Sequence, residues 1–148
     1  MSQTFSNLEY HIIFSTQDRR STIPPEMQNR LYDYVGGILK TERCVLLAVG
    51  GTADHVHLLI STHTQIAVAD LMRMVKSKSS KWIYETFPEH KDFHWQAGYG
   101  AFTVSRSIRD QVEKYIGAQE EHHRKFSFRD ELAALLKKCG VEFDPRYL

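Results

Sequence analysis

Hydrophobic and polar positions follow two different periods in the first half of the chain. Residues 8–16 alternate between apolar and polar side chains, which predicts a strand. Pro24-Pro25 suits a helix start, and the residues up to about 40 carry apolar side chains at helical spacing, which predicts an amphipathic helix over 25–40. A second strand is predicted over residues 44–49. Gly50-Gly51 then marks a tight turn, so this strand and the next, residues 54–60, are expected to form a hairpin.

The second half of the chain contains more helix than strand. In chain order, its predicted elements are a helix over 66–87, a strand over 99–104, a helix from Ser105 or Ser107, a helix over 129–138 and a tail over 141–143. Ser107 and Asp110 are spaced like a capping box, which favours a helix start at this point. The tail is expected either to add a short strand or to pack without one.

The order of these elements predicts the fold class. The pattern is β-α-β-β-α-β followed by extra helices, which indicates an α+β fold. We expect an antiparallel sheet with helices on one face, the ferredoxin-like or RRM-like plan, plus a C-terminal helix. No repeat, low-complexity tract or linker interrupts residues 1–148, so a single domain is expected.

Composition narrows the function classes without choosing among them. The chain has 42% hydrophobic and 25% charged residues, as in an ordinary soluble globular protein. No apolar run approaches the roughly 20 residues that span a bilayer, so no membrane partner is expected, and residues 1–5 lack the features of a signal peptide. Cys44 and Cys139 have no CxxC spacing, which suits the reducing cytoplasm. A net charge of +1 still permits a nucleic-acid partner, because the charge is unevenly distributed.

The strand at residues 54–60 carries the first candidate chemistry. His55 and His57 are two positions apart, so both side chains point to the face opposite the apolar positions of the strand. Two such imidazoles could share a metal ion, or they could be half-exposed strand residues with no ligand. An amidohydrolase barrel needs about 250 residues, and a cupin is all-β, so neither use of this spacing fits. Whether His11 joins the pair depends on the strand order.

The helix after Ser105 carries polar residues where its packing side should stay apolar. At about 100° per residue, the apolar anchors of this helix share one side with Tyr115, Gln119 and His122. Buried polar groups need partners, although a tyrosine and a glutamine bonded at a helix edge would explain the pattern too. Two imidazoles and the Gln119 amide would give a cation three neutral ligands, leaving its charge to polarise a phosphate. Tyr115 could then act as the nucleophile and form a phosphotyrosine.

Taken together, these residues resemble a known family. His55-Val56-His57 resembles the HUH motif, and Tyr115-Ile116-Gly117-Ala118-Gln119 is similar to the catalytic helix of the single-tyrosine HUH transposases of the insertion sequence 200/605 family. The likeness spans nearly the whole chain, from Tyr10-His11-Ile12-Ile13-Phe14-Ser15 through the segment 95–102 to Glu121-His122-His123.

The resemblance implies a reaction, a metal and a partner. His55, His57 and Gln119 would bind Mg²⁺ or Mn²⁺. Tyr115 would attack a DNA phosphate, stay joined to the 5′ side and release a 3′-OH, and attack by another 3′-OH would rejoin the strand. Similar enzymes recognise hairpins of single-stranded DNA at element ends. They form homodimers whose active sites combine the histidines of one subunit with the tyrosine helix of the other.

DNA contacts are predicted from basic and aromatic side chains. Basic side chains neutralise phosphates, and an aromatic ring can stack on an unpaired base. The candidates are Arg19, Arg20, Lys76, Lys78, Lys81, Trp95 and Arg106. A solvated helix face would explain the lysines, and burial under the sheet would explain an aromatic ring.

Two other function classes stay open. One is a non-catalytic nucleic-acid-binding module in which the histidines are incidental. RNA-binding sheets of this plan display aromatic residues where this chain has His55 and His57. The other is a metal-dependent phosphodiesterase that uses water as its nucleophile, with Tyr115 only orienting the substrate.

Overall fold

The alternating and helical patterns fold into a layered arrangement of strands and helices. The computed structural model describes residues 3–148. The strands are β1 (Leu8–Ser15), β2 (Val45–Gly51), β3 (His55–Thr62) and β4 (Gly100–Thr103). The α-helices are α1 (Pro25–Thr41), α2 (Val68–Thr86), α3 (Arg109–Gly117), α4 (Gln119–His122) and α5 (Phe128–Lys138). Single 3₁₀ turns lie at Gln17–Arg19, Pro88–His90, Arg106–Ile108 and Pro145–Tyr147.

The strand order places the histidines at the centre of the sheet. Within the described residues, the strands form one four-stranded antiparallel sheet in the order β2-β3-β1-β4. In the central pair, Ser15 lies opposite His55 and Ile13 lies opposite His57. Because side chains alternate along a strand, His11 of β1 shares the face of the two β3 histidines.

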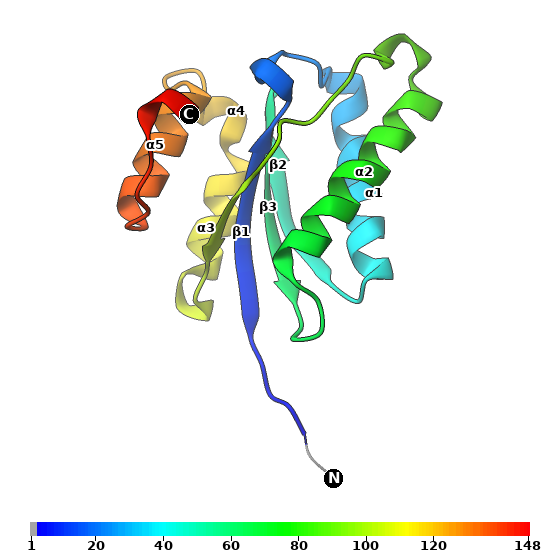
Figure 1. The fold of residues 1–148 in the computed structure, drawn as a ribbon. Coiled ribbons are helices and arrows are strands. Elements are labelled where there is room, and N and C mark those ends of the chain that lie inside the picture. Colours follow the sequence, from blue (N-terminus) through cyan, green and yellow to red (C-terminus); the bar gives the residue numbers. More distant parts are fainter. Residues whose placement is uncertain (1–2) are drawn as a thin grey trace.

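Helices cover both faces of this sheet (Figure 1). α1 and α2 pack on one face, where the main core includes the alternate residues Ile12, Phe14, Val56, Leu58 and Ile60. α3, α4 and α5 lie on the other face, where Ile13 and Leu59 centre two smaller clusters. The predicted α+β class with an antiparallel sheet is confirmed, and the added C-terminal helices lie opposite the first two. None of the helices in residues 3–148 combines the length and apolar character needed to cross a bilayer.

The predicted turn at Gly50-Gly51 is wrong. Both glycines are the last residues of β2, paired with His57 and Val56, and the turn to β3 lies at residues 52–54. A Cβ added at Gly50 would lie 2.0 Å from the carbonyl oxygen of Ile116. The glycine is therefore explained by the close approach of the α3 backbone to β2, not by a turn.

The segment after β4 also differs from its prediction. It begins with the 3₁₀ turn Arg106–Ile108, and the helix breaks at Ala118, between α3 and α4. The capping box is wrong, because Ser105 and Ser107 bond each other through their hydroxyls and neither caps the helix. Residues 141–143 form no strand. The other predicted elements agree with the structure to within two residues at each end.

Candidate metal and nucleophile site

The site is built first from the histidine face of the central strands. His55 and His57 are fully buried, with no exposed side-chain surface. His11 Nε2 lies 2.7 Å from His57 Nδ1, and the two rings stack. On the other side, Asp54 Oδ1 accepts a hydrogen bond from His55 Nδ1 at 2.7 Å. The Nδ1 atoms of both β3 imidazoles thus have hydrogen-bond partners, and their Nε2 atoms face α3–α5.

The break at Ala118 brings Gln119 to this face. Gln119 is the first residue of α4 and is buried, and its Oε1 lies 3.0 Å from His55 Nε2. Tyr115 lies one turn earlier, with its ring centroid 5.7 Å from that of His57. The structure therefore brings together the four residues to which the sequence assigned chemistry.

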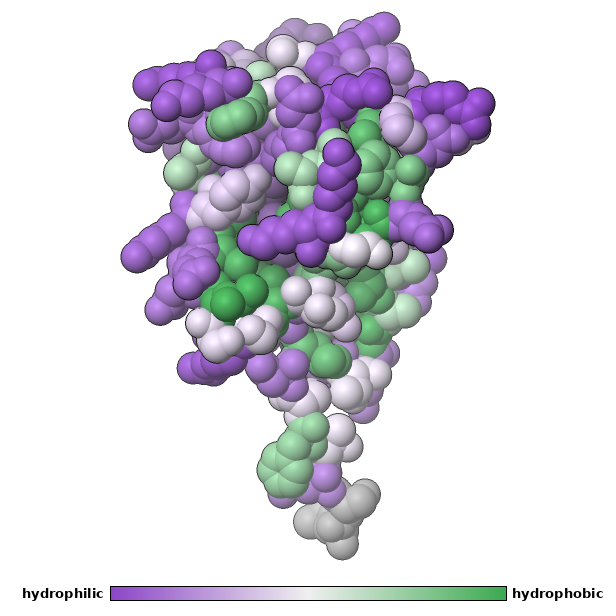
Figure 2. Space-filling model, turned by 90° about the vertical axis from the view of Figure 1, so that its left-hand side faces the viewer, coloured by the Kyte–Doolittle hydropathy of each residue, from purple (hydrophilic) through white to green (hydrophobic). Residues whose placement is uncertain are grey.

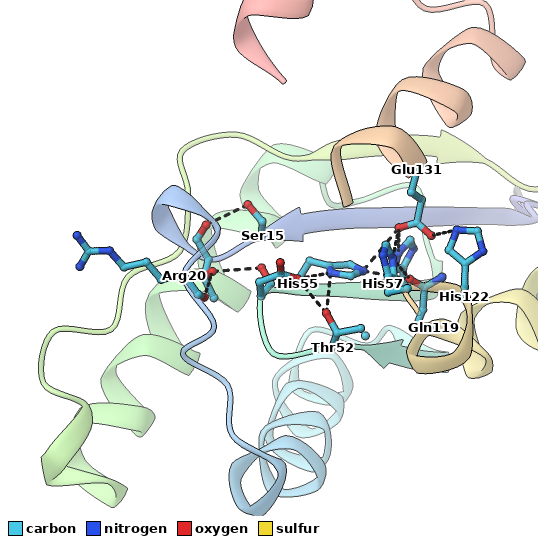
Figure 3. Close-up of polar contacts among 12 residues, drawn as sticks. Ser15, Arg20, Thr52, His55, His57, Gln119, His122 and Glu131 are labelled. Atoms are coloured by element: carbon cyan, nitrogen blue, oxygen red, sulfur yellow. Dashed lines mark hydrogen bonds and ion pairs between the residues drawn. The ribbon is translucent and has the colours of Figure 1, made fainter. Parts of the chain in front are cut away.

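Sequence reasoning missed Glu131, which α5 carries into the centre of the site (Figure 3). Its Oε1 lies 2.8 Å from His57 Nε2, and its Oε2 accepts a hydrogen bond from the Tyr115 hydroxyl. Ser127 caps α5 by accepting a bond from the Asp130 amide, and Phe128 packs on the His55 ring. A signal was available, because a carboxylate three residues after Phe128 falls on the apolar side of an amphipathic helix.

His123 also lies in the site, although it was not among the predicted ligands. Its Nε2 lies 3.0 Å from Gln119 Oε1 and 3.1 Å from Glu131 Oε1. His122, its neighbour, lies closer to Tyr115 and contacts the other Glu131 oxygen at 3.3 Å. These histidines lie three and four residues after Gln119, so the short helix α4 and its end bring three polar side chains to one place.

Burial and charge set the protonation states of the site. Although burial raises it, hydrogen bonds from His57 and Tyr115 hold the pKa of Glu131 far below its usual range. Burial, the bond to Glu131 and the charge of Glu131 raise the pKa of Tyr115. Burial is also the main cause that lowers the pKa of His57. At neutral pH the site therefore holds an ionised carboxylate, a protonated phenol and a neutral His57 imidazole.

The hydrogen bonds made by the Nδ1 atoms of His55 and His123 leave their Nε2 atoms available to a cation. His55 Nδ1 donates to Asp54, and His123 Nδ1 donates to the carbonyl oxygen of Phe126 at 2.6 Å. In a neutral imidazole the remaining Nε2 then carries a lone pair. Both lone pairs face Gln119 Oε1, which is itself an acceptor, at 3.0 Å. Acceptors that converge in this way without a donor between them are arranged as metal ligands are.

The predicted DNA-contact residues lie in different parts of the fold. Lys76 donates to the carbonyl oxygens of Gln96 and Gly98, and the Trp95 indole donates to Ser79 Oγ while its ring packs on Phe14. Both side chains therefore hold the loop before β4.

The remaining basic candidates have more accessible side chains. Lys78 and Lys81 are exposed on α2, across the sheet from Tyr115, and Arg106 is exposed before α3. Arg19 lies over the Phe128 ring, and the exposed Arg20 points away from the polar cluster (Figure 3). Arg19 is thus the predicted basic residue that contacts α5 at the site.

Tyr115 lies beside the histidines of its own chain. In this arrangement, called cis, one chain supplies both the histidines and the tyrosine of a site. Exchange of the tyrosine helix between the subunits of a homodimer stays a prediction.

The chain resembles known transposases in sequence. It is 29% identical over 119 residues to the ISDra2 transposase TnpA of Deinococcus radiodurans. The aligned region covers 77% of this chain and 85% of that protein. It is 26% identical over 130 residues to the transposase for insertion sequence element IS200 of Salmonella typhimurium, covering 84% of each.

Solved structures and a family comparison agree with these relatives. The fold matches the crystal structure of a Deinococcus radiodurans protein with a TM-score of 0.66 at 28% identity, over 78% of this chain and 95% of that one. It also matches a REP-associated tyrosine transposase bound to a REP hairpin, with a TM-score of 0.57 at 13% identity, over 78% and 70%. Residues 4–119 match the family described as "Transposase IS200 like", a match that ends at Gln119, before α5. The chain therefore belongs to the IS200-like transposase family.

Proposed function

We propose that this transposase cleaves and rejoins single-stranded DNA through a covalent bond between Tyr115 and a 5′-phosphate. The observation that carries the proposal is the contact between the Tyr115 hydroxyl and a buried cluster of potential metal ligands. In the cleavage step, the Tyr115 oxygen attacks phosphorus, the bond from phosphorus to the 3′ oxygen breaks, and that oxygen leaves as a 3′-OH. Attack by another 3′-OH reverses these bonds and frees Tyr115.

The ligands proposed for the cation are His55, His57 and Gln119. The cation proposed is Mg²⁺ or Mn²⁺, and when bound it would polarise the phosphate and stabilise the leaving oxygen. Asp54 and His11 fix the orientation of the two imidazoles through their Nδ1 atoms.

Glu131 prepares Tyr115 for attack by controlling its proton. The Tyr115 hydroxyl already donates to Glu131 Oε2, so the carboxylate is in place to accept this proton as the phosphate is attacked. In the free chain Tyr115 stays protonated, since burial, followed by the hydrogen bond to Glu131 and its charge, raises the pKa of the phenol. Tyr115 therefore stays a phenol in the free chain, with the acceptor for its proton already in contact.

A groove gives DNA a route to Tyr115. A cavity of about 540 Å³ lies between α3 and α5, with His11, Tyr115 and Glu131 at its inner end. Its walls are largely apolar, including Ile108 and Phe126, and Figure 2 shows apolar surface on this side of the molecule. An apolar groove with an exposed aromatic ring suits an unpaired nucleotide better than a duplex.

The proposed function also includes a DNA substrate, an assembly and a cellular location. Hairpins of single-stranded DNA at element ends are the proposed substrate, and a homodimer that works in the cytoplasm is the proposed assembly. The sequence relatives are transposases, and the REP-associated transposase was solved with a hairpin, which supports the choice of substrate.

Trapping of the covalent intermediate tests the proposal. Labelled single-stranded hairpins from the DNA that flanks the gene are incubated with protein and Mn²⁺ and separated on denaturing gels. We expect a protein–DNA adduct that is lost in Tyr115→Phe and kept in Tyr147→Phe, because Tyr147 is exposed at the C-terminus. Cleavage that survives Tyr115→Phe would refute the tyrosine mechanism in favour of water attack, and binding without cleavage would indicate a binding module.

A further inference from the structure

We infer that Glu131 and His123 supply two further ligands to the proposed cation and make its site selective for a transition metal over Mg²⁺. This inference rests on the proposed function, because it concerns the same cation. It adds ligands from two residues that lie after the segment matched by the family.

The Glu131 carboxylate divides its two oxygens between the cation site and the nucleophile. Oε1 lies 2.8 Å from His57 Nε2 and 3.6 Å from His55 Nε2, and Oε2 accepts the hydrogen bond of Tyr115. The side chain is only 2% exposed. A buried carboxylate needs a compensating charge. Oε1 is surrounded by imidazole nitrogens that a cation would also contact, so the carboxylate stands where it would compensate that cation.

His123 presents a lone pair to the same point. Its Nδ1 donates to the Phe126 carbonyl, so in the neutral imidazole the lone pair is on Nε2, which lies 3.1 Å from Glu131 Oε1. A metal-ligating histidine usually donates its other ring N–H to an acceptor such as a backbone carbonyl. Ligand atoms from His55, His57, His123 and Glu131 all lie within 4.8 Å of one another. His122 differs, because its nearer Glu131 oxygen is Oε2, on the Tyr115 side, so it provides a matched control.

The combined ligand set determines which cation fits. Three imidazole nitrogens, one carboxylate oxygen and one amide oxygen suit Mn²⁺, Fe²⁺, Co²⁺ or Zn²⁺, because imidazole is a preferred ligand of transition metals. Mg²⁺ prefers oxygen ligands, gives up its water reluctantly and usually keeps several water molecules. At this site the ligand atoms already lie in contact with one another, which leaves little space for retained water. The site should therefore bind Mn²⁺ more tightly than Mg²⁺.

Metal binding tests this inference without an activity readout. Protein is stripped with a chelator, and Mn²⁺ affinity is measured from the electron paramagnetic resonance signal of free Mn²⁺, with Mg²⁺ as competitor. We expect Glu131→Gln and His123→Gln each to weaken Mn²⁺ binding at least tenfold, while His122→Gln and Asp130→Asn change it less than twofold. Mg²⁺ at equal concentration should displace less than a tenth of the Mn²⁺. Circular dichroism of the stripped proteins confirms that each variant is folded.

The nitrogen ligands can be counted independently. Electron spin echo spectra of bound Mn²⁺ should show coupling to three imidazole nitrogens in the wild type and two in His123→Gln. Unchanged Mn²⁺ affinity in Glu131→Gln and His123→Gln would overturn the inference, as would equal affinity for Mg²⁺. If the Tyr115 adduct still forms in those cases, the proposed function stands and only the added ligands are refuted. Failure of the wild type both to bind metal and to form the adduct would refute both.

Discussion

Gly50 determines how closely the nucleophile helix packs on the sheet. A Cβ at this position would lie 2.0 Å from the carbonyl oxygen of Ile116, the residue after Tyr115, and ordinary van der Waals contact begins at 3.4 Å. In Gly50→Ala, α3 must therefore withdraw from β2 by about 1.4 Å. Because the backbone fixes the position of a Cβ and the group it meets is a backbone carbonyl, no side-chain rotation can relieve the overlap. We expect a loss of about 1–3 kcal/mol in the free energy of unfolding, as for other overpacked sites.

The same displacement moves Tyr115 and Gln119 relative to the histidines of β3. A misplacement of about 1 Å at a reacting group costs on the order of 100-fold in rate. The rate of Tyr115 adduct formation is measured on denaturing gels, and unfolding is followed in urea by circular dichroism. Rates are compared in conditions where every protein is fully folded, so that the loss of stability does not contribute to the loss of rate.

Gly37→Ala is the matched control. Gly37 lies within α1, and a Cβ there meets nothing within 4 Å. Alanine is favoured over glycine in a helix by about 1 kcal/mol, so this variant should be at least as stable as the wild type and equally fast. A Gly50→Ala protein with the wild-type adduct rate would refute the reasoning, since it would mean that the spacing between α3 and β2 does not set the geometry of the site.

Three further predictions concern a buried ion pair, the loop before β4 and a histidine of the site. Arg109→Met leaves the carboxylate of Glu9 buried without its ion pair and should lower the unfolding free energy in urea by about 3 kcal/mol; a loss below about 1 kcal/mol would contradict this. Lys76→Met removes the bonds to the loop before β4 and should lower the melting temperature, whereas exposed Lys78→Met should not; equal melting temperatures would count against the role of Lys76. Burial, and after it the repulsion that would arise if His11 and His57 were both protonated, lowers the pKa of His11 from 6.5 to about 4. The folded chain thus binds this proton less readily than the unfolded chain, and metal-free protein should lose up to about 3 kcal/mol as the pH falls from 6.5 to 4. His11→Gln should show a shallower decline of melting temperature with pH, and identical slopes would refute the assignment.

The strands and long helices could be predicted because each follows a regular hydrophobic period. β1 alternates in the sequence, and its apolar side chains Ile12 and Phe14 lie in the main core as the alternation requires. The same reasoning placed His55 and His57 on the opposite face, where both are buried and His55 contacts Gln119. Local periodicity was sufficient in these cases, because each element has to bury its own apolar side.

The errors occurred where the function of a residue depends on a distant segment. Gly50 has the local features of a turn glycine, and only the position of Ile116 in the fold explains it as a packing glycine. Trp95 was predicted to contact DNA, with burial under the sheet as the alternative. Its indole is bonded to Ser79 and its ring packs on Phe14, contacts that the local sequence does not indicate, and a DNA contact stays a prediction. No periodicity within either segment contains this information, since it arises from contacts between elements.

Glu131 illustrates how the polar members of such a site could be found from sequence. The apolar side of α5 includes Phe128, Leu132 and Leu135, and Glu131 lies among them. A carboxylate on the buried side of a helix costs free energy unless a cation or several donors compensate it. Here Tyr115 and His57 provide such contacts. Because compensation has to come from outside the helix, an acidic residue inside an apolar period indicates a polar site elsewhere in the fold. For a chain with an HUH strand and a tyrosine helix, that site is the one these two elements form.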